Sequence, residues 1–221
     1  MSNLAVTSSA ILIASLCLTA CITKREHVLA PSAEGIVIDA ASDRPVAGAQ
    51  VRYGGLERAA PAVTGADGRF SLEGRTEDRT IVAMPVGGVY RDSTLVHVSA
   101  PDLADGYASA AFISMGKPAQ ALYRVTVLLF PPDADETPLH AMMRDCIEGP
   151  EQRHALHLAD HIAGLDPASP PAWLDEDAAE ALEEHLSITL PASAFRDCER
   201  MDEAYAAFRA QTAALRAFGG P

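Results

Sequence analysis

The stretch TGADGRFSL, residues 64–72, decides how this chain folds. Asp67-Gly68 is a tight-turn pair, because glycine tolerates the positive φ that such turns require. The residues that follow alternate, with Phe70 and Leu72 separated by a polar neighbour, and this period of two is typical of a strand that buries one face. The stretch has no histidine and no charge cluster, so we expect it to build the fold rather than to perform chemistry.

The same pattern of turns and alternating residues continues on both sides of residues 64–72. Turns rich in glycine, proline and aspartate separate short alternating or β-branched runs, and this pattern predicts an antiparallel β-sandwich. In the run STLVHVSA the alternation puts Val96 and Val98 on one face and His97 on the other, so we expect His97 to be exposed rather than a ligand. The seven runs are residues 35–40, 49–53, 69–73, 79–85, 93–100, 107–115 and 123–130.

The region GIVIDAASDRPVAGAQVRY, followed by VTGADGRFSL, resembles the carboxypeptidase regulatory-like domain. This resemblance implies a seven-stranded, transthyretin-like antiparallel sandwich over residues 35–131, and an α+β chain once the helical tail is added. In that family the motif residues are structural, and the module accompanies peptidases, transporters and surface proteins without catalysing a reaction. The matching positions are Gly35, Val37, Asp39, Pro45, Gly48, Ala49, Val51, Thr64, Asp67, Gly68, Phe70 and Leu72.

The first 21 residues differ in composition from the rest. They carry no charged side chain, and the apolar core at 10–18 has the length of a signal-peptide h-region and is too short to span a bilayer. LTAC, residues 18–21, resembles the bacterial lipobox. The resemblance implies that residues 1–20 are a signal peptide and that Cys21 receives a diacylglyceryl group and an acylated amine. A plain secretory signal and a membrane-retained anchor are the alternatives.

The residues after Cys21 are expected to join the lipid to the fold. Ile22 in this position resembles the sorting pattern of outer-membrane lipoproteins in Gram-negative bacteria, which implies an outer-membrane protein that faces the periplasm. The stretch ITKREHVLAPSAE is polar and aperiodic, so residues 21–34 are interpreted as the lipidated cysteine and a tether.

The proline-rich, acidic stretch FPPDADETP marks a boundary, and the remainder is expected to be a small helical subdomain over residues 138–218. Pro150 can occupy the first turn of a helix. Asp175 is a possible N-cap of the next helix, which has acids in its first turn. Trp173 is expected to pack the helices, and the acids at 175–184 to form a solvated helix face.

The four cysteines divide by position. Cys17 leaves with the signal peptide and Cys21 is the lipid site, so only Cys146 and Cys198 remain in an oxidising compartment. We expect them to form a disulfide, which on the chain-entropy model stabilises the fold by roughly 4 kcal/mol. Two buried free thiols are the alternative.

Three histidines form a stripe on the helix that begins at Pro150. His154, His157 and His161 lie at i, i+3 and i+7, but they extend over about two turns of a straight helix, which is too far for one ion to reach all three. At most an adjacent pair could bind a metal, with a ligand from elsewhere. We therefore expect a solvated boundary face and no metal or other cofactor, with metal binding or a pH-responsive contact as the alternatives.

Charge and missing motifs limit the function. The net charge of −13 opposes binding to nucleic acid, which needs a cationic face. Among the motifs of hydrolases, zinc peptidases, P-loop proteins and thiol oxidoreductases, none occurs in the sequence. The leading hypothesis is a membrane-anchored, non-catalytic module that binds a protein or glycan partner. A metal-binding or enzymatic protein using His154, His157 or His161, and a purely structural envelope component, are the alternatives.

Overall fold

The structure of the chain is a computed structural model, and it describes residues 22–56, 60–82, 91–113, 122–134, 137–147 and 149–218. The predicted signal peptide and Cys21 lie outside these residues. The strands are β1 (Ile22–Ala30), β2 (Ala33–Asp39), β3 (Arg44–Pro45), β4 (Gln50–Tyr53), β5 (Ala62–Val63), β6 (Arg69–Leu72), β7 (Arg75–Val82), β8 (Arg91–Ser99), β9 (Gly106–Ile113) and β10 (Tyr123–Leu129). The helices are α2 (Pro138–Met143), α3 (Pro150–Ala163), α4 (Glu176–Thr189) and α5 (Met201–Ala214), with short 3-10 helices η1 (Ala192–Phe195) and η2 (Leu215–Ala217).

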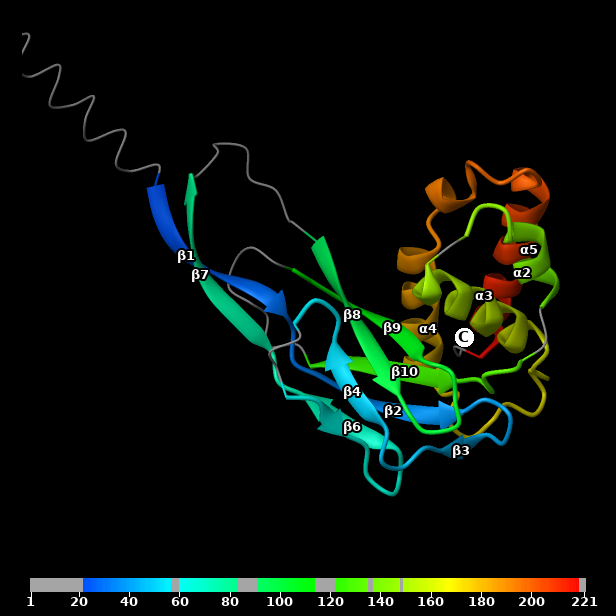
Figure 1. Cartoon of the computed structure of the whole chain (residues 1–221), viewed down its shortest axis with the longest axis horizontal. Helices are drawn as coiled ribbons and strands as arrows, with labels where there is room; N and C mark the ends of the chain where they lie inside the picture. Colours follow the sequence, from blue (N-terminus) through cyan, green and yellow to red (C-terminus); the bar gives the residue numbers. More distant parts are fainter. Residues whose placement is uncertain are drawn as a thin grey trace, which may run out of the picture.

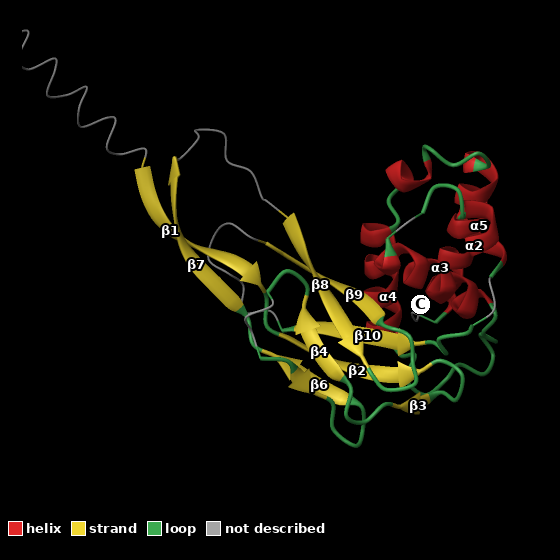
Figure 2. Cartoon of the chain, in the orientation of Figure 1, coloured by secondary structure: helices red, strands yellow, loops and turns green. Residues whose placement is uncertain are grey.

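The strands form two four-stranded sheets that share a core and one separate two-stranded ribbon (Figures 1 and 2). One sheet runs β10-β2-β3, with β6 also paired to β2, and the other runs β5-β4-β8-β9. The mixed α+β class and the mainly antiparallel sheets agree with the sequence. The seven-stranded transthyretin-like description does not, because the described residues contain ten strands in three sheets. The core side chains between the two sheets include Val37, Val51, Phe70, Val96 and Val127.

The turns of the TGADGRFSL region serve the sheet pairing. Gly68 has a φ of 71°, and a Cβ there would lie 2.7 Å from the carbonyl oxygen of Val37, so only glycine fits. The Thr64 hydroxyl accepts from Ala49 N and donates to the carbonyl of Val46, which ties two loops together. Phe70 then packs over Gly35 on the neighbouring strand.

Strand β10 and its neighbour β2 run parallel, which corrects the expectation of a wholly antiparallel sandwich. Parallel neighbours need a long crossover, and all the strands between β2 and β10 supply it. Residues 125–129 are all buried, because Val127 faces the other sheet while Leu128 faces the helices. A strand covered on both faces has a continuous apolar run, which is the pattern of VTVLL.

The stretch expected to be an irregular tether begins instead with strand β1. It pairs antiparallel with β7, from Ile22 opposite Val82 to Ala30 opposite Arg75. This ribbon extends from the end of the molecule remote from the helices (Figure 1). Most of its residues are polar. Among its described side chains only Val28 and Ala30, near the sandwich end of β1, are buried, so the long apolar alternation that identifies strands is missing.

The helices pack on the outer face of the sheet rather than forming a separate unit. Their core includes Ile38 of β2 and Leu128 of β10. Asp175 caps α4 by accepting from Ala178 N at 2.9 Å, as its position predicts. Among the described residues, no helix is both long and apolar enough to cross a membrane.

Two further contacts fix the helical layer. Cys146, after α2, pairs with Cys198, before α5, as a disulfide with Cα atoms 5.0 Å apart. Trp173 is buried in the helical core, and its indole Nε1 donates to Asp43 Oδ1 at 2.9 Å in the turn between β2 and β3. The Cys146–Cys198 disulfide thus links two parts of the helical layer, and the Trp173 indole links this layer to the sheet region.

Candidate functional site

Six of the seven histidines lie in one network of ring contacts at the junction of sheet and helices. Two aromatic rings connect them: Tyr107 of β9 and Phe130, which directly follows β10. The remaining histidine, His27, belongs to the β1–β7 ribbon. The members of the network are His97, His140, His154, His157, His161 and His185.

The α3 stripe is only in part the solvated boundary face that its sequence position predicts, because His154 is buried whereas His157 and His161 are half-buried. The ring of Phe130 lies 5.7–5.8 Å, centre to centre, from His154, His157 and His161. His154 is only 7% exposed, and its Nε2 donates to the carbonyl oxygen of Leu128 at 2.7 Å. The three imidazoles therefore form part of the contact between α3 and the end of β10. The helix pattern alone did not show which element would cover this stripe.

His154 and His185 form a buried pair between α3 and α4, with ring centres 6.2 Å apart. Burial lowers the pKa of His154 to about 4 and that of His185 to about 3. His154 Nδ1 and His185 Nε2 have no hydrogen-bond partner in the described structure. Both rings are therefore neutral at neutral pH, and a proton on either would be buried without a counter-charge.

His185 also lies beside two hydroxyls. Its Nδ1 is 3.1 Å from Ser109 Oγ and 3.1 Å from Thr189 Oγ1. A serine beside a histidine is the first element of a nucleophilic site, but a general base works best with a pKa near the working pH. A ring whose pKa is about 3 accepts a serine proton poorly, so these contacts fit a structural hydrogen bond better than catalysis.

His97 is half-buried, not exposed as expected from the alternation of its strand. Its side chain is 13% exposed. Arg52 Nε donates to His97 Nδ1 at 3.0 Å, and His97 Nε2 lies 2.9 Å from Asp105 Oδ2. The ring also stacks on Tyr107, with centres 5.1 Å apart. Side chains on the outer face of the sheet, including those of Arg52, Asp105 and Tyr107, thus cover most of His97.

A groove of about 460 Å³ opens beside this network. One wall comes from the loops at the end of the sandwich, and the other comes from α2 and α3. Apolar and aromatic side chains predominate, and a few groups can carry charge. The lining residues are Ala104, Asp105, Tyr107, Phe130, Pro131, Pro132, Ala134, His140, Pro150, Arg153, His154 and His157.

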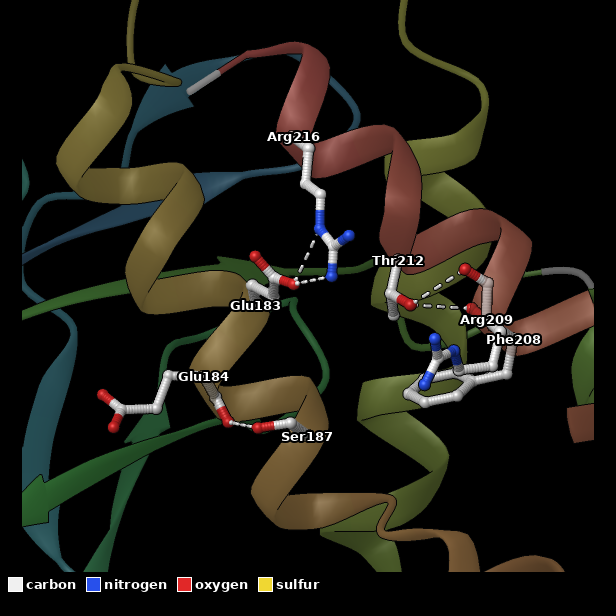
Figure 3. A network of polar contacts seen from close by, with 7 residues as sticks. All are labelled: Glu183, Glu184, Ser187, Phe208, Arg209, Thr212 and Arg216. Carbon is white, nitrogen blue, oxygen red and sulfur yellow. Dashed lines mark hydrogen bonds and ion pairs between the residues drawn. The ribbon is translucent and has the colours of Figure 1, made fainter. Parts of the chain in front are cut away.

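A smaller hollow of about 180 Å³ lies between α4 and α5. Figure 3 shows three of its polar side chains, Ser187, Thr212 and Arg216, bonded to a carbonyl of their own helix or to Glu183. Arg216 donates to Glu183 at 3.2 Å, while Thr212 donates to the carbonyl of Phe208 and Ser187 to a carbonyl of α4. The hydrogen-bonding capacity of these groups is largely used within the helices, so the larger groove is the better candidate site.

The three histidines of the α3 stripe do not form a metal centre of three or more ligands. Across the part of the chain that the structure describes, no three His, Cys, Asp or Glu side chains converge as a metal centre would require. His157 instead meets His140 of α2, a residue that sequence reasoning did not single out. Only a contact map could have shown this pair, because 17 residues separate the two histidines.

Neither a scan of family models nor a search of curated proteins finds a match to this chain. The resemblance to the carboxypeptidase regulatory-like domain therefore remains a prediction from sequence motifs. The function has to be argued from the site itself.

Proposed function

We propose that this protein is a lipid-anchored module of the bacterial envelope, and that its groove binds a segment of a protein partner without catalysing a reaction. The groove beside the histidine network is the observation that carries the proposal. Its volume of about 460 Å³ falls within the range of about 300–1,000 Å³ that is typical of binding pockets. The loops at the end of the sandwich form one of its walls, and such loops are where binding residues are commonly found.

The lining favours a protein segment over a glycan. Three prolines and two alanines form apolar parts of the wall, and these suit side chains of a peptide. A sugar would need the face of an aromatic ring, but Tyr107 already stacks on His97, and Phe130 lies against the three histidines of α3. The lining therefore favours a protein partner. The crosslinking experiment below distinguishes it from a glycan.

The absence of catalysis is part of the same proposal. The buried histidines have lowered pKa values, and Ser109 has no activated base beside it. The groove offers surface complementarity rather than an arrangement of nucleophile, base and oxyanion donors. No specific contact favours the alternative of an enzyme that uses the α3 histidines.

The anchor rests on the lipobox at residues 18–21. Strand β1 begins at Ile22, directly after the proposed lipid site, and the β1–β7 ribbon lies at the end of the molecule opposite the helices (Figure 1). In this proposal a paired ribbon replaces a flexible tether and presents the groove away from the outer-membrane surface toward the periplasm. The resemblance to the carboxypeptidase regulatory-like domain belongs to the proposal and rests on the sequence motifs alone.

Intact mass tests the anchor. The full chain is expressed with its own signal in a Gram-negative host and measured with and without reductant. We expect a chain that begins at Cys21 and is heavier by its acyl groups, and a gain of two hydrogen atoms on reduction of the Cys146–Cys198 disulfide. An unlipidated mass would contradict the anchor but would leave the groove untouched.

Photo-crosslinking in the cell envelope tests the groove. A photoreactive residue at Pro132 of the groove should form a defined protein adduct, and the same residue at Val63, which is 60% exposed and outside the groove, should not. Adding Ala134→Trp, which fills the groove, should abolish the adduct. An adduct whose mass falls on muramidase digestion would identify a glycan instead. Equal crosslinking from both positions, or none from Pro132, would refute a binding role for the groove.

A further inference from the structure

His140 and His157 approach each other at a separation that is long for a hydrogen bond. His157 Nε2 lies 3.4 Å from His140 Nδ1, the ring centres are 5.2 Å apart and the ring planes are inclined by 59°. A normal hydrogen bond from a ring N–H is shorter, at about 2.7–3.2 Å. Both residues line the groove and are half-buried, so they are accessible to small solutes.

The spacing matches two ligands of one metal ion. Two imidazole nitrogens that each lie about 2.0–2.1 Å from a tetrahedral ion are about 3.3 Å apart, with ring centres about 5.2 Å apart. The observed separations are 3.4 Å and 5.2 Å. Two rings joined in line by a hydrogen bond of the same length would have centres farther apart, at about 5.7 Å. The two rings thus have the spacing of a chelating pair.

Other contacts of α2 hold His140 and His157 in place. Asp160 of α3 accepts from the backbone N of Leu139, next to His140, at 3.1 Å. Thr137 caps α2, and the Cys146–Cys198 disulfide holds the chain just beyond its end. A helix of six residues is unstable by itself, so these contacts fix the position of His140 relative to α3.

We propose that His140 and His157 bind one divalent transition-metal ion, Cu²⁺ more tightly than Zn²⁺, at the wall of the groove. Neutral imidazole suits both ions, and the order of affinities follows the Irving–Williams series. The protein supplies two ligands, and the open groove leaves the remaining positions to water or to a donor atom of a bound partner. The net charge of −13 and the nearby Asp160 favour a cation, while Arg153 of the same groove opposes it. This site does not depend on the proposed protein partner.

Calorimetric titration of the full chain with Cu²⁺ and Zn²⁺ tests the site, on protein purified without a histidine tag. We expect one equivalent of Cu²⁺ to bind more tightly than Zn²⁺. His140→Gln and His157→Gln should each weaken Cu²⁺ binding by about tenfold or more. Because both ligands hold the same ion, the double variant should lose less than the product of the single losses. His27→Gln, in the β1–β7 ribbon, is the matched control and should bind as the parent does.

A second measurement uses the unaltered protein, so it tests the site even if the variants fail to fold. In a histidine-selective NMR spectrum, substoichiometric Cu²⁺ should broaden the ring signals of His140 and His157 before those of His27. The proposal is overturned if the parent takes up no Cu²⁺ in a saturable one-to-one manner. It is also overturned if either glutamine variant keeps the parent affinity, or if the His27 signals broaden first.

Discussion

Acidification should destabilise this protein through the buried pair His154 and His185. Both rings are more than nine-tenths buried where α3 and α4 pack on the sheet, and burial lowers their pKa values to about 4 and about 3 from the ordinary 6.5. His157, which can also become positive, lowers the pKa of His154 further. No carboxylate contributes to the pKa of either ring, so a proton on it would meet no opposite charge.

The direction and the size of the change in the free energy of unfolding follow from proton linkage. Below pH 6.5 the unfolded chain binds a proton at each of these histidines, while the folded protein does not until the pH approaches 4 for His154 and 3 for His185. The free energy of unfolding therefore falls as the pH is lowered through this window. Between pH 7.5 and pH 5 each histidine should cost about 2 kcal/mol of stability, or about 4 kcal/mol together. This loss is a large share of the 5–15 kcal/mol that is typical of a folded domain.

Urea unfolding at a series of pH values measures the effect. The single tryptophan, Trp173, reports on the junction, because its indole bonds to Asp43 of the sheet region. With an m-value of about 2 kcal/mol/M, the midpoint should fall by about 2 M between pH 7.5 and pH 5. The double variant His154→Gln, His185→Asn keeps polar atoms near the bonded ring nitrogens but does not titrate, so its midpoint should change much less.

The control is His27→Gln in the ribbon, which should keep the full pH dependence. The reasoning is refuted if the parent loses less than about 1 kcal/mol over this range. It is also refuted if the double variant keeps the slope of the parent, because the protons would then bind elsewhere.

Three further predictions concern the framework and use the same urea assay at pH 7.5. Replacing Cys146 and Cys198 by serine should lower the free energy of unfolding by about 4 kcal/mol, since the disulfide closes a loop with a sequence separation of 52; an unchanged midpoint would contradict this. Asp175→Ala removes the cap of α4 and should cost about 1 kcal/mol, whereas Asp175→Asn should cost less. Gly35→Ala brings a Cβ against the carbonyl oxygen of Val125 and should cost about 3 kcal/mol or leave no folded protein; a parent-like midpoint would show that the strands can separate there.

Local features of the fold were predictable because the sequence marks them directly. The Asp67-Gly68 turn and the alternation of Phe70 and Leu72 specify a turn followed by strand β6. Asp175 is placed as an N-cap by its own position before an apolar run, and the structure has the hydrogen bond. These features depend on residues a few positions apart, so the sequence shows them without any knowledge of the fold.

Other features depended on partners far along the chain. The ribbon strand β1 was missed because its partner β7 begins 45 residues after the last residue of β1, and because in β1 the described side chains before Val28 are not buried. The parallel pairing of β10 with β2 was missed because antiparallel neighbours are the usual result of short turns. His185 and His97 carried no signal of burial, since α3 and β9 supply the neighbours that cover them.

By itself the sequence indicated the longer strands of the two four-stranded sheets, the helices that begin at Pro150 and after Asp175, and the Cys146–Cys198 pair. Only the tertiary structure decided what the histidines do. Helical spacing placed His154, His157 and His161 on one stripe, but the end of β10 and Phe130 bury His154 and leave the other two half-buried. Helix α2 brought His140 beside His157, at a sequence separation of 17. Periodicity fixes which side of an element a residue occupies, whereas packing decides what meets that side.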